Sequence, residues 1–107
     1  MYTEFNAGGK TYRLRLTTKN VVLLEKRIGC NPLAVFGNGD TIPTVTTMVN
    51  ILQCAMLQYN HGITVEEAYN IFDEWLDEGH TTTDFISVIL DIYRASGIIK
   101  GEQVEKN

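Results

Sequence analysis

The sequence has 107 residues, of which 44% are hydrophobic and 21% are charged, and its formal net charge is −4. This length fits one domain with a single modest core, and the composition excludes a wholly disordered chain. No apolar run approaches the roughly 18 residues of a membrane span. Residues 1–10 lack the basic and apolar segments of a signal peptide, so we expect a cytosolic protein.

Charge is distributed unevenly along the chain. Residues 1–27 hold six basic and two acidic side chains, which gives +4. Residues 28–93 hold nine acidic side chains and no Lys or Arg, which gives −9, and residues 94–107 return +1. The sequence is therefore a charge dipole.

Residues 2–16 predict a β-hairpin, because polar and apolar side chains alternate on both sides of Gly8-Gly9. With these two glycines as the loop, Phe5 faces Tyr12 on an apolar side. Glu4 then faces Arg13 on a polar side. A lone hairpin is marginal in water, so we expect its apolar side to pack on helices or on another subunit.

Five helical segments follow in the 3.6-residue pattern. Residues 20–28 form the first, with Thr17 or Thr18 as its N-cap and Gly29 after its end. Residues 32–36 form a short second helix, and residues 44–59 form the most apolar one.

The two remaining helices are residues 65–78 and 85–95. A capping box of Thr64 and Glu67 opens the former, and Asp84 with the preceding threonines caps the latter. The pattern predicts an α+β fold that is predominantly helical: an N-terminal antiparallel hairpin packed on a bundle of four to five short helices. We expect one domain over residues 1–99 and a frayed polar tail over 100–107, with 37–40 as the most flexible segment.

No catalytic or metal-binding pattern is apparent. Neither Ser87 nor Ser96 lies in a nucleophile turn, and no local motif supports Cys30 with either histidine. The histidines and cysteines lack metal-ligand spacing, and the carboxylates of residues 73–78 follow one helix face, unlike a calcium loop. We expect a protein that is not an enzyme and that binds no cofactor and no metal.

A second possibility is a small DNA- or regulator-binding domain of a mobile element. Arg13 and Arg15 on an exposed strand face, with Lys10, Lys19 and Lys26, are the basic residues that favour it. The acidic helices would repel a phosphate backbone, so we expect no nucleic acid as the main partner.

The chain resembles the small tail assembly chaperones of long-tailed, siphovirus-type phages and prophages, to which gene transfer agent tail proteins are related. The resemblance covers about residues 3–99. The residues that carry it are Gly9, Tyr12, Leu14, Leu16, Thr17, Leu24, Glu25, Gly29, Asn31, Pro32, Leu33 and the segment Ile63-Thr64-Val65-Glu66-Glu67-Ala68.

The resemblance implies a non-catalytic protein of tail morphogenesis in the host bacterial cytoplasm. Such proteins bind the tape measure protein, promote assembly of the tail tube around it, and are absent from the mature virion. Some form head-to-tail oligomers, and some have a frameshifted longer form that engages the tube protein. No membrane partner is implied.

The charge dipole and the wide apolar stripe of the last helix agree with self-association and with binding of a partner helix. The alternative interpretation is that the charge separation is incidental and the stripe is core. The expected surface comprises Arg13, Arg15, Lys19, Lys26, Arg27, Leu57, Glu66, Glu67, Asp73, Glu74, Asp77, Glu78, Phe85, Ile89 and Ile92.

Overall fold

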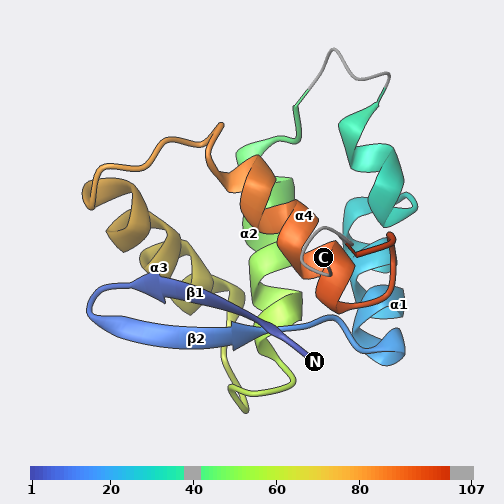
Figure 1. Ribbon diagram of the computed structural model, residues 1–107, viewed down its shortest axis with the longest axis horizontal. Coiled ribbons are helices and arrows are strands. Elements are labelled where there is room, and N and C mark those ends of the chain that lie inside the picture. Colours follow the sequence, from blue (N-terminus) through green and yellow to red (C-terminus); the bar gives the residue numbers. More distant parts are fainter. Residues whose placement is uncertain (38–41, 102–107) are drawn as a thin grey trace, which may run out of the picture.

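The structure is a computed structural model that describes residues 1–37 and 42–101 (Figure 1). Residues 38–40, from the segment expected to be most flexible, and residues 102–107 of the expected tail lie outside the described residues. The described elements are β1 (Thr3–Ala7), β2 (Lys10–Leu14), α1 (Thr18–Ile28), the 3₁₀ helix η1 (Pro32–Phe36), α2 (Val45–Met56), α3 (Val65–Asp77) and α4 (Phe85–Ala95). The predicted α+β fold, a hairpin followed by helices, is confirmed.

The hairpin has the register that the sequence predicts. Phe5 lies opposite Tyr12, and Glu4 lies opposite Arg13. Its turn uses Gly8 and Gly9 at φ values of 59° and 78°, which a two-residue primed turn requires and which side chains with a Cβ rarely adopt. With this register, Phe5 and the other apolar residues on one side of the hairpin are buried against the helices.

The helix ends agree with the predicted caps, with three differences in detail. Residues 32–36 form a 3₁₀ helix and not an α-helix. The helix predicted over residues 44–59 ends at Met56, because residues 57–59 form a turn. Before α4, the predicted cap is wrong in detail, because the Asp84 side chain makes no hydrogen bond to the helix; instead the Thr81 hydroxyl accepts from the Asp84 backbone N–H and the Asp84 carboxylate accepts from the Thr81 N–H.

Helix α2 lies at the centre of the molecule, between α1 on one side and α3 on the other (Figure 1). Every residue from Met48 to Met56 except Asn50 is buried. Beside α2, an aromatic cluster joins the hairpin to two further helices, with Phe5 from β1, Phe72 and Trp75 from α3, and Phe85 from α4. Within residues 1–37 and 42–101, no helix is both long enough and apolar enough to cross a membrane.

Candidate functional site

Helix α3 carries its acidic residues on two different faces. Glu66, Asp73 and Asp77 are exposed, and their spacing of seven and four residues puts them on one side of the helix. Tyr69, which is 37% exposed, follows Glu66 by three residues and precedes Asp73 by four, so it lies on the same side of the helix. These four residues form what we call the acidic face.

The other acidic residues of α3, and Glu78 just after its end, lie against neighbouring parts of the molecule. Glu67 accepts from the Thr64 backbone N–H and so completes the predicted capping box. The Gly8 N–H of the hairpin turn donates to Glu78 over 2.8 Å. A Cβ on Gly8 would overlap the Glu74 carboxylate. Glu67 therefore holds the start of the helix and Glu78 the hairpin turn, while Glu74 lies against that turn.

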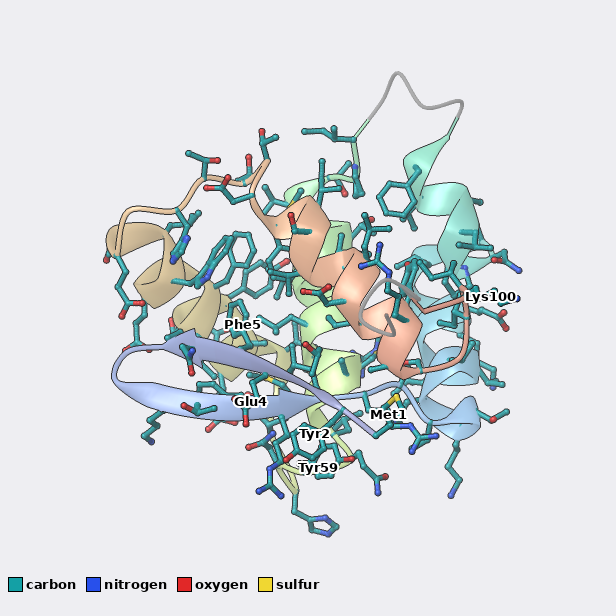
Figure 2. All side chains as sticks on the ribbon, in the orientation of Figure 1. Met1, Tyr2, Glu4, Phe5, Tyr59 and Lys100 are labelled. Atoms are coloured by element: carbon teal, nitrogen blue, oxygen red, sulfur yellow. The ribbon has the colours of Figure 1, made fainter. Side chains whose placement is uncertain are left out.

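Helix α1 carries the basic charge on the opposite side of α2. Lys19 and Lys26 are exposed, and Lys100 lies on the same side of the molecule (Figure 2). Arg27 is different, because its guanidinium donates to the amide oxygen of Gln53 and lies 3.9 Å from the Cys54 sulfur. The basic residue at position 27 is therefore engaged in the α1–α2 contact.

Gln53, which accepts the hydrogen bond from Arg27, is a buried polar residue. Its side chain is 3% exposed, and its amide also donates to the Ile63 carbonyl over 2.8 Å. Burial raises the pKa of the adjacent Cys54 thiol, and the positive charge of Arg27 offsets part of that rise. The thiol thus stays protonated at neutral pH, which makes a nucleophilic role for Cys54 unfavourable.

An aromatic and basic cluster lies on the outer side of the hairpin, and the sequence analysis missed it. The Arg13 guanidinium carbon is 4.8 Å from the centre of the Tyr2 ring, and the Tyr2 and Tyr59 rings meet edge to face with centres 5.6 Å apart. Figure 2 shows both tyrosines together below the hairpin. We call Tyr2, Arg13 and Tyr59 the aromatic-basic patch. Strand alternation continued back from β1 places Tyr2 on the outer side with Glu4. The sequence pattern therefore indicates the position of Tyr2, but not that of Tyr59.

Arg15 directly follows β2, two positions after Arg13, and is only partly exposed. Its backbone N–H donates to the Ala55 carbonyl of α2 over 2.9 Å. The Nε atom of its side chain is buried and makes no hydrogen bond to the described residues. Arg15 is therefore partly a packing residue, and its predicted surface role is weaker than that of Arg13.

The predicted partner surface on α4 is wrong. Phe85, Ile89 and Ile92 are each 0% exposed, because α4 packs against both α2 and the hairpin. The stripe is wide because it contacts two neighbours, and its main residues are core. Leu57 is half-buried and offers little free surface.

The candidates for nucleophile and metal chemistry are scattered. His61 follows α2 and is exposed, whereas His80 follows α3 and stacks on Trp75 with ring centres 4.3 Å apart. Cys30 follows α1, and α1 lies on the opposite side of α2 from α3 (Figure 1). Among residues 1–37 and 42–101, no group of three or more His, Cys, Asp or Glu side chains could hold a metal ion.

A groove of about 350 Å³ lies between the hairpin and the first turns of α3. Tyr12 and Lys10 line it from β2, Ile63 and Ile71 provide apolar surface, and polar groups come from Glu67, Asn70 and Glu74. Burial, and secondly the negative charge of Glu74, raise the pKa of Tyr12. The Tyr12 hydroxyl therefore remains protonated at neutral pH.

No curated protein and no solved structure matches the chain. A family model does match, over residues 3–107, and so covers the hairpin and all the helices described above. The chain belongs to the family of unknown function DUF6096.

Proposed function

We propose that the protein is a tail assembly chaperone of a long-tailed phage or prophage. In this role it is not an enzyme. It binds the tape measure protein in the host cytoplasm and promotes tail tube assembly before the mature virion forms. The observation that supports this most is the location of opposite charges on two different surfaces, with the exposed Arg13 on the outer side of the hairpin and the exposed carboxylates of the acidic face on α3. Two different, complementary surfaces on one small domain favour head-to-tail association.

The two surfaces that would meet between copies are the aromatic-basic patch and the acidic face. Tyr and Arg side chains are the types that contribute most to binding energy in protein interfaces. Arg13 would approach Asp73 of the next copy, and Tyr69 would add ring surface beside the charges. Reversing the charge on one side alone should weaken self-association, and the attraction should fall with salt.

The tape measure protein requires apolar surface that the α4 stripe does not supply. Leu33, Ile42 and Val45 are between 44% and 52% exposed. Leu33 lies on η1, Val45 is the first residue of α2, and Ile42 lies in the segment before it. These residues replace the α4 stripe as the candidate contact for a tape measure helix.

The first test is complementation of charge reversals, read by sedimentation velocity at low and high salt. Arg13→Glu alone and Asp73→Lys alone should each lower the association constant by about tenfold, and an equimolar mixture of the two should recover it. Lys100→Glu is the matched control on a different surface. A wild-type chain that stays monomeric at high concentration and low salt contradicts the self-association.

The second test is co-expression with the tape measure protein encoded by the same genome. We expect that protein to be soluble and to co-purify only when this chain is present. Leu33→Glu should reduce its recovery without changing the melting temperature of the chaperone. Insoluble tape measure protein in both cases, together with a shift of duplex DNA in a gel, would support the DNA-binding alternative.

A further inference from the structure

The outer edge of β2 has backbone groups available for pairing. In an antiparallel hairpin closed by a two-residue turn, alternate residues direct their N–H and C=O groups away from the partner strand. On β2 these are Thr11 and Arg13, and the next in the series, Arg15, already donates its N–H to Ala55. Within the described part of the chain, Thr11 and Arg13 have no backbone partner on this edge.

The outer edge of β1 is covered instead. β1 lies between β2 and the helices α3 and α4, while β2 forms the outer border of the hairpin (Figure 1). At the end of β1 the Gly8 N–H is bonded to Glu78. Proteins usually protect exposed strand edges, because such edges pair readily with other chains. Here β1 packs against α3 and α4 whereas β2 packs against α2, so the outer edge of β1 is the more protected of the two.

The groove between the hairpin and α3 lies along the same strand. Tyr12 and Lys10 direct their side chains toward the helices, as do the buried Phe5 and Ala7 opposite them. A strand added beside β2 would direct alternate side chains to this helix-facing side. Glu67 and Glu74 contribute two negative charges to the groove and Lys10 one positive charge, so a basic side chain fits there best.

The outer side of β2 favours the opposite charge. A residue of the added strand that lies across from Arg13 has its side chain within reach of that guanidinium. The added strand should therefore carry an acidic residue opposite Arg13 and, next to it in sequence, a basic residue opposite Tyr12. The acidic side chain then pairs with Arg13, and the basic side chain enters the groove. The required segment is therefore extended and carries adjacent acidic and basic residues among apolar or β-branched ones.

We propose that β2 and this groove bind an extended segment of a partner protein by strand addition. Backbone hydrogen bonds to Thr11 and Arg13 supply affinity, and the basic side chain in the groove supplies selectivity. This site goes beyond the proposed function, because it needs neither head-to-tail association nor a helical partner. A second copy of β2 is a poor occupant, since antiparallel pairing about Tyr12 brings two Arg13 side chains onto neighbouring positions of one face.

The test uses a synthetic peptide, acetyl-Val-Glu-Lys-Thr-Val-amide, titrated into the isotopically labelled full chain. We expect the amide signals of Thr11 and Arg13 to shift and their hydrogen exchange to slow. N-methylation at the glutamate of the peptide removes a hydrogen bond to Arg13 and should weaken binding by about tenfold. N-methylation at the lysine, whose N–H points away from β2, is the matched control and should change binding little.

The groove is tested separately with two protein variants. Glu67→Gln keeps the capping box, because Gln is also suited to that position. This variant should bind the peptide about fivefold more weakly than the wild-type chain. Glu66→Gln on the acidic face is its control. Equal binding of the two N-methylated peptides, or no binding of the parent peptide, overturns the proposal. Protection of Thr11 and Arg13 in a peptide-free dimer also overturns it, since a second copy is then the occupant.

Discussion

Helices α1 and α3 flank α2 in similar positions but are held there by different forces. Both begin after a threonine cap, Thr17 in α1 and Thr64 in α3. In α3, Ala68, Ile71, Phe72 and Trp75 are buried, whereas in α1 only Leu24 is. Buried apolar surface is the main favourable term in folding, so α3 is part of the core and α1 is attached to it.

The contact of α1 with α2 combines partly buried apolar residues, Val21, Leu23 and Ile28, with one polar contact. Arg27 reaches Gln53, which is buried in the next helix. A polar contact to a buried amide contributes little net free energy, but its loss leaves an unsatisfied group. The comparison teaches that α1 should open before α3, in a local transition with a lower free energy than global unfolding.

The largest expected effect is on the α3 side. Phe72→Ala removes a ring that contacts both Trp75 and Phe85, and should lower the free energy of unfolding by about 3–5 kcal/mol. Urea denaturation followed by circular dichroism measures this. Tyr69→Ala, on the exposed face of the same helix, is the control and should cost far less. A loss for Phe72→Ala no greater than for the control would show that α3 is not part of the core.

A smaller effect is expected where α1 joins α2. Arg27→Ala leaves the oxygen of Gln53 without this donor and should cost about 1–3 kcal/mol. Hydrogen exchange should accelerate in α1 and stay nearly unchanged in α3. Lys26→Ala tests whether loss of a neighbouring positive charge alone has any effect. Equal acceleration in both helices would mean that α1 does not open separately.

The smallest effect concerns the two caps. Thr64→Ala removes the hydroxyl that accepts from the Glu67 N–H and should cost about 1 kcal/mol, and Thr17→Ala should cost about half of that. Thermal unfolding of the two variants beside Thr64→Ser, which keeps an acceptor oxygen, gives the comparison. A larger loss for Thr17→Ala would indicate that the start of α1 is more tightly held than its buried surface implies.

Local signals in the sequence were sufficient for most of the fold. The Gly8-Gly9 turn determines the register of the hairpin, and Thr64 with Glu67 determines the start of α3, because both depend on residues close in the chain. The end of α2 was placed three residues too late. Tyr59 continues the apolar periodicity beyond Met56, where the helix stops and the turn lets Tyr59 contact Tyr2 instead.

The candidate site was harder to predict, since it depends on contacts between distant residues. A wide apolar stripe on a helix can face either a partner protein or a second neighbour within the same fold. The sequence alone does not distinguish these, and in the structure Phe85 faces the hairpin. Arg27 is exposed as predicted, but its hydrogen bond to Gln53, 26 positions away, follows only from the packing of α1 on α2. Only the tertiary arrangement separates the carboxylates that hold the hairpin turn from those of the acidic face.

The two ends of the described chain depend on each other, and this affects how the protein folds during synthesis. The Leu16 N–H donates to the Ser96 hydroxyl, and the Tyr93 hydroxyl donates to the Pro32 carbonyl. The ring of Phe5 likewise packs on Phe85 of α4. The hairpin precedes all the described helices in the chain, and its apolar side is fully covered only when both α3 and α4 have been made. The apolar side of the hairpin therefore stays partly exposed during synthesis, and its native packing is completed only when α4 is available.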